Sequence, residues 1–218
     1  MKWGYTIKPI PHSDRPRRER EHEAVMQLVQ TLAGKDARLD HRPDGSPLII
    51  GSPFHISLSH SRNYVALAWS DSPGIGIDIE ELRPEQLARI APRFLSAEEL
   101  PLYGTSPDLL LQAWTLKEAA FKALRTGPAD LRLYRLPESL ESLESLMLLL
   151  SLESENSEQS EISEESENSE NSEKFENSKK LGSSMPLIQT PDGPLAILLS
   201  APVAGLPLFL SAVSPFPR

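Results

Sequence analysis

The sequence predicts an α+β fold with two similar halves, each a helix packed on a small antiparallel sheet. Segments with helical periodicity alternate with short apolar runs of period two, and turns rich in Pro, Asp and Gly separate them. This helix-plus-strand pattern occurs twice along the chain. Repetition of one helix-and-sheet unit is the basis of the two-half prediction.

The first half is predicted to hold one helix followed by three strands. Residues 17–33 place apolar side chains on one side of a helix, namely Ala24, Val25, Leu28, Val29 and Leu32. A turn at Pro43-Asp44-Gly45 precedes strands at 47–50, 54–58 and 64–69. In the last of these strands, the apolar residues Val65, Leu67 and Trp69 alternate with small ones, which is typical of a strand.

The second half is predicted to begin with a strand at 75–79, after a turn at Ser72-Pro73-Gly74. Helices are expected at 84–92, 96–103 and 107–124. The second of them opens with a capping box, in which Ser96 and Glu99 satisfy each other's backbone N–H groups. Three further strands are expected at 186–190, 194–200 and 206–213.

A low-complexity insertion, residues 138–180, interrupts the second half. Its Ser, Glu and Asn residues repeat every three positions, a period that matches neither helix nor strand. Few apolar groups and a high negative charge predict a largely disordered segment, with an acidic interaction segment as the alternative. The predicted organisation is an N-terminal half-domain, 1–73, and a C-terminal half-domain, 74–137 plus 181–218.

The net charge of −9 belongs to this insertion. It carries 13 Glu and three Lys, whereas the rest of the chain has 18 acidic and 19 basic residues. The one basic cluster is Arg15, Arg17, Arg18 and Arg20, which is more typical of a solvated helix face than of a phosphate-binding patch. No nucleic-acid partner is therefore expected.

Composition also restricts the chemistry and the compartment. The chain has no cysteine, which excludes disulfides, thiolate metal sites and a cysteine nucleophile. It has no apolar run long enough for a membrane span and no secretory signal at its beginning. We therefore expect a cytoplasmic protein without a membrane partner.

Two carboxylates stand out in the apolar strand around residue 78. Asp78 and Glu80 share one strand face, while Ile77 and Ile79 turn to the other. Two like charges on one face repel unless a cation or a base joins them. An edge strand with a solvated face is the alternative interpretation.

The helix at 107–124 adds a third carboxylate and a lysine. Glu118 and Lys122 are four residues apart and share a helix face, with Trp114 and Phe121 beside them. If that face meets the strand carrying Asp78, three hard oxygen donors converge, a set that suits Mg²⁺ bound to a phosphate ester. An ordinary surface ion pair is the alternative.

His60 ends a strand in the run Ser59-His60-Ser61, which offers several hydrogen-bond donors to an anion. A lone histidine is more often structural than functional. No G-x-S-x-G elbow and no Walker loop occur, so the sequence does not support a serine hydrolase or a P-loop nucleotidase.

Together these motifs resemble the 4′-phosphopantetheinyl transferase family, in its larger, two-half, monomeric type. The matching blocks are Phe54 to Ser61 (FHISLSHS), Gly76 to Glu80 (GIDIE), Arg93 to Ser96 (RFLS) and Trp114 to Lys122 (WTLKEAAFK). Each block alone is a weak signal, but the four in this order are specific. The resemblance covers about residues 40–125.

The resemblance implies a function and assigns roles to residues. It implies Mg²⁺-dependent transfer of 4′-phosphopantetheine from coenzyme A to a serine of an apo acyl or peptidyl carrier protein, releasing 3′,5′-ADP from a cleft between the halves. The implied metal ligands are Asp78, Glu80 and Glu118, with Glu118 and Lys122 as catalytic residues. The implied coenzyme A contacts are His60, Ser59, Lys122 and, as a second candidate, Lys117.

The chain also departs from the family pattern. It has Gly45-Ser46-Pro47 where the family often has Gly-Lys-Pro, and Met26 where an arginine is common. Both departures weaken the expected nucleotide binding, and Arg18, Arg20 or Arg42 are candidates to compensate. The insertion lies where the family has a short connection, so it is expected to be dispensable.

Three competing functions remain at this stage. The first is a catalytically degenerate homologue that binds coenzyme A or a carrier protein. The second is an interaction protein that acts through its acidic segment, and the third is another Mg²⁺-dependent phosphate enzyme. The sequence does not identify the carrier protein or the tolerance for acyl-coenzyme A.

Overall fold

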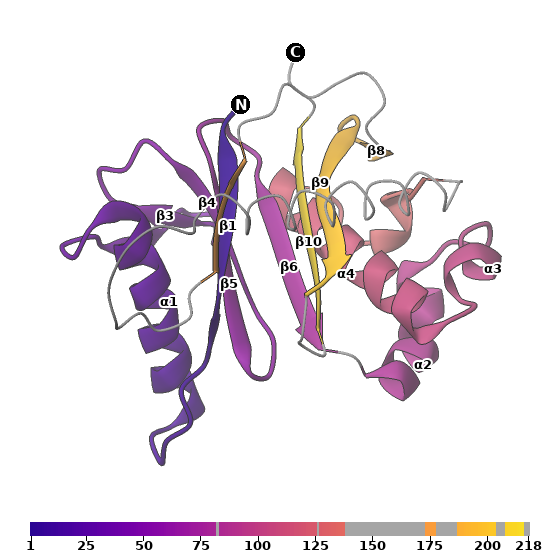
Figure 1. The fold of residues 1–218 in the computed structure, drawn as a ribbon. Coiled ribbons are helices and arrows are strands. Elements are labelled where there is room, and N and C mark those ends of the chain that lie inside the picture. Colours follow the sequence, from indigo (N-terminus) through magenta and orange to yellow (C-terminus); the bar gives the residue numbers. More distant parts are fainter. Residues whose placement is uncertain (82, 126, 138–172, 178–186, 204–207, 216–218) are drawn as a thin grey trace, which may run out of the picture.

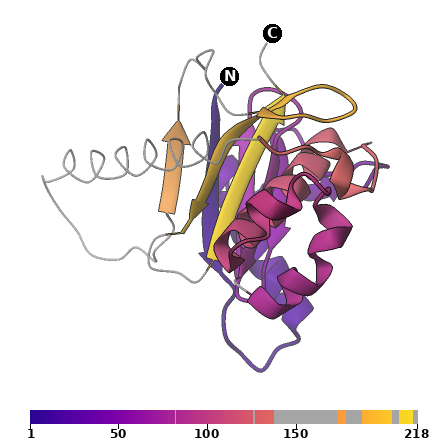
Figure 2. The same ribbon diagram turned by 90° about the vertical axis from the view of Figure 1, so that its right-hand side faces the viewer.

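The computed structural model of the chain describes residues 1–81, 83–125, 127–137, 173–177, 187–203 and 208–215. Two four-stranded antiparallel sheets pack against each other between helices (Figure 1). Helix α1 covers the outer face of the first sheet (Figure 1). Helix α4 covers that of the second sheet with α2 and α3 packed on it, and this helical layer faces the viewer in Figure 2. The predicted α+β class is confirmed.

The first sheet has the strand order β4-β5-β1-β7. Its strands are β1 (Trp3–Pro9), β4 (His55–His60), β5 (Tyr64–Ser70) and β7 (Glu173–Asn177). Helix α1 (Arg17–Ala33) buries Leu28 and Val29 against Leu67 and Trp69 of β5. A separate hairpin consists of β2 (Leu39–His41) and β3 (Pro47–Ile49).

The second sheet has the order β6-β10-β9-β8. Its strands are β6 (Gly76–Glu81), β8 (Leu187–Ile188), β9 (Leu195–Pro202) and β10 (Leu208–Pro215). Its helical layer consists of α2 (Pro84–Phe94), α3 (Leu100–Tyr103) and α4 (Pro107–Leu124), followed by a 3₁₀ turn, η1 (Leu131–Leu133). Nearly every face of α4 is buried, because the sheet lies on one side and α2 on another.

The inner face of the first sheet is made of small side chains where it meets β6. Ala66 and Ala68 of β5 are fully buried there, and the strand register places Ser59 and Ser57 of β4 beside them. The two serine hydroxyls accept hydrogen bonds from the backbone N–H groups of β6. Ile77 N donates to Ser57 Oγ over 3.1 Å, and Ile79 N donates to Ser59 Oγ over 3.3 Å. The serines thereby satisfy backbone groups on the β6 edge that β10 does not pair.

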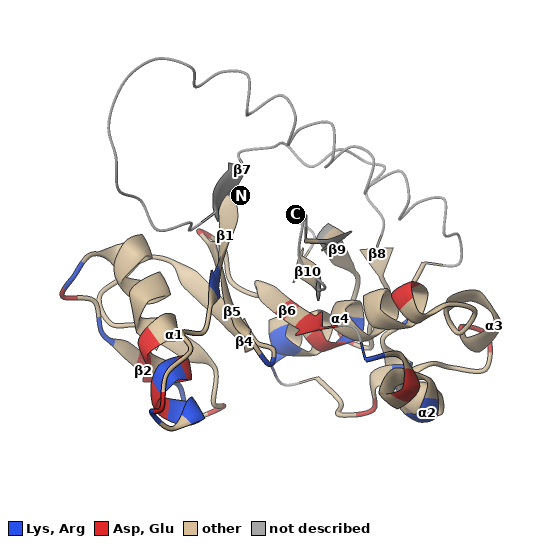
Figure 3. Cartoon of the chain, turned by 60° about the horizontal axis from the view of Figure 1, so that its bottom comes forward, with Lys and Arg blue, Asp and Glu red and all other residues tan. Residues whose placement is uncertain are grey.

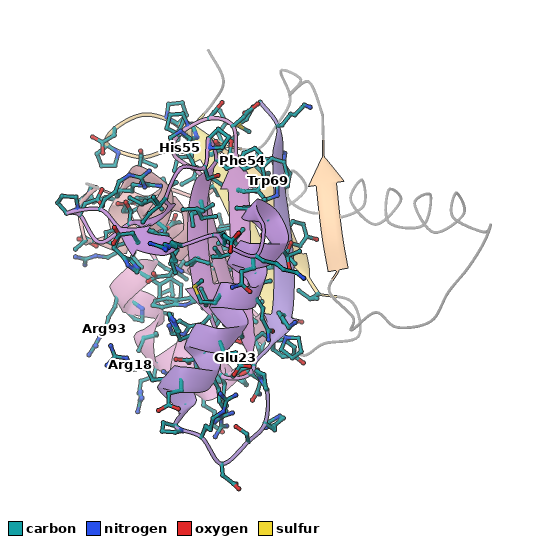
Figure 4. All side chains as sticks on the ribbon, turned by 90° about the vertical axis from the view of Figure 1, so that its left-hand side faces the viewer. Arg18, Glu23, Phe54, His55, Trp69 and Arg93 are labelled. Carbon is teal, nitrogen blue, oxygen red and sulfur yellow. The ribbon has the colours of Figure 1, made fainter. Side chains whose placement is uncertain are left out.

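The outer face of the first sheet carries the large side chains. Val65, Leu67 and Trp69 alternate with the alanines and point toward α1. Phe54 packs on Trp69 with ring centroids 4.9 Å apart, next to His55 (Figure 4). The alternation of apolar and small residues along β5 thus separates a helix-facing side from a sheet-facing side.

Most predicted elements are present with small boundary shifts. The expected helix at 96–103 is shorter, since only Leu100–Tyr103 is helical, but its capping box forms: Ser96 N donates to Glu99 and Glu99 N donates to Ser96. The sequence did not predict β1 or β2. It also predicted no strand in 138–180, whereas β7 pairs with β1 there; the other residues of that segment lie outside the described ones.

Within the described residues, no helix combines the length and the apolar character needed to cross a membrane.

Gly76 sets the distance between β6 and α4. A Cβ atom at this position would lie 2.0 Å from the backbone oxygen of Ala119 and 2.7 Å from the backbone nitrogen of Ala123. Backbone atoms in a buried helix cannot move aside as a side-chain end can. Glycine is therefore required for the close approach of the strand that carries Asp78 to the helix that carries Glu118.

We predict that Gly76→Ala destabilises the fold by about 3 kcal/mol or more, because it overpacks this contact. Gly34→Ala is the control: Gly34 has φ 95° and ψ 163° but open space around it, so only backbone strain of about 1–3 kcal/mol is expected there. Urea unfolding of the two variants measures the difference. Equal losses would contradict the close-approach role of Gly76.

Candidate active site

A pocket of about 310 Å³ lies where β4, β6 and α4 meet. It is called the carboxylate pocket here and is lined by Leu58, Ser59, His60, Asp78, Ile79, Glu80, Trp114, Glu118 and Lys122. Acidic and basic positions lie side by side at this junction (Figure 3). The structure thus brings together six of the seven residues that the sequence singled out.

Asp78 is the centre of a buried hydrogen-bond network. It is only 7% exposed, and its Oδ1 accepts hydrogen bonds from Lys122 Nζ at 2.7 Å and from Ser59 Oγ at 2.8 Å. Lys122 Nζ also donates to Ser59 Oγ over 2.9 Å. Both bonds go to Oδ1, so Oδ2 has no hydrogen-bond partner among the described residues. The pair is charge-assisted and largely buried, with the Asp78 side chain 9% and the Lys122 side chain 29% exposed, which makes it stronger than a surface ion pair.

The Ser59 hydroxyl is fully engaged in this network. It donates to Asp78 and accepts from Lys122 and from the backbone of Ile79. A hydroxyl has one donor and two acceptor sites, so none remains for a ligand. Ser59 therefore positions Asp78 and Lys122 in this structure, whereas the resemblance implied a direct contact with coenzyme A.

Glu80 occupies the more open side of the pocket. Its Oε1 accepts from Arg83 at 2.6 Å and from the backbone N–H of Glu81 at 3.0 Å. Asp78 and Glu80 line the same pocket, as the period-two argument predicted, while Ile77 and Ile79 are buried between the sheets. Arg83 belongs to no motif, so the sequence did not point to it.

Glu118 lies among like charges. Burial raises its pKa, and the negative charges of Asp78 and Glu80 raise it further, while Lys122 opposes them. A carboxylate in this setting is a stronger proton acceptor than one in water. The pocket therefore places excess negative charge around Glu118, which a cation would balance.

The chemistry of these carboxylates fits a hard divalent cation. Three carboxylates line one pocket, the charge around Glu118 is unbalanced, and Asp78 keeps one oxygen available. In the described residues, however, no three His, Asp or Glu side chains are close enough to share an ion. Lys122 holds Asp78 and Arg83 holds Glu80, so these ion pairs keep the acids apart.

Lys117 does not belong to this site, and its assignment as a coenzyme A contact is corrected. Its side chain is fully buried on another side of α4, where Nζ donates to Glu99 at 2.5 Å and to the carbonyl of Leu131 at 3.2 Å. Burial lowers the pKa of Lys117, and Glu99 raises it again. The ammonium ties α4 to the segment after α2, so its role is structural.

Glu99 is the hub of that structural network. Besides Lys117, its carboxylate accepts from the backbone N–H groups of Ser96 and Leu136. Phe94, from the same RFLS block, packs edge-on against Trp114 with ring centroids 5.1 Å apart. This block therefore supports the pocket wall from behind and does not contact the pocket itself.

His60 lies at the exposed rim of the carboxylate pocket. Its Nδ1 is 4.0 Å from Glu21 of α1, and Glu21 accepts a hydrogen bond from Arg17 at 2.7 Å. Arg17 also donates to the carbonyl of Ser61 over 3.0 Å. Arg17 thus contacts the loop that follows His60. The sequence had favoured a solvated helix face for all four arginines of its cluster, which are Arg15, Arg17, Arg18 and Arg20.

One region of the chain matches a known protein family. Residues 74–173 match the family model of the 4′-phosphopantetheinyl transferase superfamily, a region that includes Asp78, Glu80, Glu118 and Lys122. Just under half of the chain, including the carboxylate pocket's β6 and α4 residues, is thus similar to that superfamily.

Several transferases of the superfamily are similar to it. Psf-1 from Bacillus pumilus, a 4′-phosphopantetheinyl transferase, is 41% identical over 90 residues, which is 38% of each chain. HetI from a Nostoc species is 32% identical over 134 residues, 53% of this chain and 56% of HetI. Sfp from Bacillus subtilis is 32% identical over 105 residues, 45% of this chain and 46% of Sfp. The chain thus spans about half the length, or less, of these relatives.

We predict that Lys117→Met destabilises this chain by about 3–5 kcal/mol, because it leaves Glu99 buried without its partner. The double variant Lys117→Met/Glu99→Gln is expected to recover part of the loss. Urea unfolding measures both. Unchanged stability together with weakened coenzyme A binding would instead support the assignment of Lys117 as a coenzyme A contact.

Proposed function

We propose that this chain transfers the 4′-phosphopantetheine arm of coenzyme A to a serine hydroxyl of an apo acyl or peptidyl carrier protein. The observation that carries the proposal is the buried Asp78–Lys122–Ser59 network beside Glu118 in one pocket. The similarity to named 4′-phosphopantetheinyl transferases supports it independently. The active site would lie between a half comprising 1–73 and a half comprising 74–137 and 181–218, in a monomer.

Mg²⁺ would be held by Asp78, Glu80 and Glu118, and it would neutralise the coenzyme A diphosphate when bound. Asp78 offers its remaining oxygen to such an ion. A cation there would also offset the negative charges of Asp78 and Glu80, which add to the effect of burial in raising the pKa of Glu118. The hard oxygen set is the reason for choosing Mg²⁺ over a softer metal.

The chain's own residues would then act as follows. Lys122, held by Ser59 and Asp78, places its ammonium beside the diphosphate and stabilises the charge that develops on the leaving phosphate. Glu118 accepts the proton of the carrier serine, directly or through water. The serine oxygen bonds to the β-phosphorus, the bond to the bridging oxygen breaks, and 3′,5′-ADP leaves.

His60 would bind the 3′-phosphate at the pocket rim. Its side chain is exposed, and Arg17, which bonds to Glu21 and to the Ser61 carbonyl, lies on the same side of the rim, so both groups are accessible to an anion from solvent. Ser59 supports this subsite indirectly through its hold on Asp78. Positioning and electrostatics thus supply most of the proposed catalysis.

We predict that Glu118→Ala and Lys122→Met each reduce transfer by at least about 100-fold, because each removes a group that acts on the reacting atoms. The assay is intact-mass spectrometry of an apo carrier protein incubated with the enzyme, coenzyme A and Mg²⁺. Wild-type enzyme adds the mass of one phosphopantetheine arm, and EDTA abolishes the addition.

Glu85→Gln is the control, because Glu85 is an exposed acid on α2 outside the pocket. It is expected to keep wild-type activity. If coenzyme A binds in a calorimeter but no carrier protein gains mass, the chain is the degenerate binder. If the protein neither binds coenzyme A nor transfers its phosphopantetheine arm, the proposed function is refuted.

Deleting residues 150–172 tests the role of the acidic insertion. This deletion keeps β7, which pairs with β1 at the edge of the first sheet. We predict that transfer continues at a rate within about twofold of wild type, since long surface insertions cost little to remove. Loss of transfer with an intact thermal unfolding transition would favour an interaction protein that depends on its acidic segment.

A further inference from the structure

Polar side chains follow the side of α4 that packs on the second sheet. Three of them each form a hydrogen bond to a different strand of that sheet. The contacts are Gln112 to Ser200 of β9, Thr115 to Ser211 of β10, and Lys122 to Asp78 of β6. Glu118 lies on the same side of the helix, three residues after Thr115 and four before Lys122. The proposed base therefore lies between two polar contacts of α4 with the sheet.

The three partners of α4 form one row across the sheet. In the strand register, Asp78 lies opposite Ser211, and Ser211 lies opposite Ser200. Side chains at directly opposite positions point to the same face of a sheet. The row that contains the carboxylate of Asp78 thus continues away from the pocket as two buried hydroxyls.

These hydroxyls close a ring of hydrogen bonds with Gln112. Thr115 Oγ1 donates to the backbone carbonyl of Gln112 over 3.1 Å, since a carbonyl oxygen can only accept. With that proton used, Ser211 donates to Thr115 over 2.8 Å, and Ser200 donates to Ser211 over 3.2 Å. Gln112 Nε2 donates to Ser200 over 3.3 Å and closes the ring. Each hydroxyl therefore gives one proton and accepts one.

The ring lies in an otherwise apolar part of the core. Its four residues are at most 4% exposed, and Leu116, Ala119 and Val213 pack in the same cluster between α4 and the sheet. Replacing such hydroxyls by apolar groups of the same shape costs little stability in general. Hydrogen bonds are directional, however, and a satisfied buried network favours a single arrangement. The ring therefore fixes the place of α4 on the sheet more strictly than apolar packing does.

The place of α4 on the sheet decides where Glu118 lies relative to Asp78. A slip of the helix by one residue moves its side chains by about 1.5 Å along the axis. Lys122 does not prevent such a slip, because its flexible four-carbon stem can follow Asp78. Misplacing a catalytic group by about 1 Å can cost about 100-fold in rate. The ring, one helical turn before Glu118, is the rigid contact that holds this distance.

We propose that Thr115 and Ser211 are positioning residues, whose hydroxyl pair fixes Glu118 beside Asp78 for metal binding and transfer. The proposal rests on the proposed function, because it says what holds the proposed base and metal ligand in place. Neither residue lines the carboxylate pocket, so both act through α4 and β10 without touching the substrate.

Two opposite substitutions at Thr115 separate positioning from packing. Thr115→Val keeps the shape and removes the hydroxyl, whereas Thr115→Ser keeps the hydroxyl and removes the methyl group. Thr115→Val is expected to lower kcat for transfer by about tenfold, with a smaller change in KM for coenzyme A, because Glu118 is no longer held in place. It is also expected to weaken Mn²⁺ binding without coenzyme A by about threefold, measured by electron paramagnetic resonance. Thr115→Ser should keep both values within about twofold of wild type.

Ser211→Ala removes the partner and should reproduce the losses of Thr115→Val. The double variant Thr115→Val/Ser211→Ala should be no worse than either single variant, as expected for residues that act through one contact. Ser214→Ala is the control, because Ser214 is a fully buried hydroxyl of the same strand that donates to Met1 Sδ and not to α4. It should leave kcat and Mn²⁺ binding unchanged. Urea unfolding checks that every variant is folded in the assay.

The positioning role is overturned if Thr115→Ser loses as much kcat and Mn²⁺ affinity as Thr115→Val. It is also overturned if Thr115→Val and Ser211→Ala lose only stability in urea, with wild-type kcat and Mn²⁺ affinity. Both results would leave the proposed transfer intact. If wild-type protein neither binds Mn²⁺ nor transfers the phosphopantetheine arm, the proposed function fails and the positioning role fails with it.

Discussion

The contact between the two sheets depends on two serine hydroxyls, and the candidate site depends on the same contact. Ser57 and Ser59 accept the backbone N–H groups of Ile77 and Ile79, so β6 lies against β4 without a backbone ladder between them. Small alanines on β5 permit the close approach. Ser59 also holds Asp78 and Lys122. The same side chain therefore contributes both to the packing of the two sheets and to the position of the charged groups. A larger side chain at Ser59 would disturb both.

Helix α4 carries out structural and chemical roles on different faces. Gly76 lets its buried alanines lie directly on β6, which brings Glu118 and Lys122 to the carboxylate pocket. The neighbouring Lys117 points elsewhere and pairs with Glu99 in the core. Two adjacent charged residues thus have unrelated functions, because successive helix positions lie about 100° apart around the axis. At the end of α4, Arg125 donates to Ser46, beside the hairpin of β2 and β3.

Local periodicity was enough to predict the core of the site. The period of two placed Asp78 and Glu80 together, and the spacing of four placed Glu118 with Lys122; both pairs share the pocket. Lys117 was assigned wrongly because its partner is 18 residues away in a capping box, a pairing that only tertiary packing creates. Strand β7 lies in a repeat with no strand period, and its pairing with β1 is long-range. Gly127 and Pro128 mark the end of this helix in the sequence, but an arginine carries no local signature of the positive φ found at position 125.

The central claim is that the carboxylate pocket holds the metal and the diphosphate of coenzyme A. The most direct measurement is a crystal structure with coenzyme A and Mn²⁺, in which the anomalous signal of manganese locates the metal. The account predicts one manganese peak between Asp78, Glu80 and Glu118, with Lys122 Nζ on a diphosphate oxygen. Manganese or the diphosphate bound elsewhere on the chain, with Lys122 still on Asp78, would contradict it.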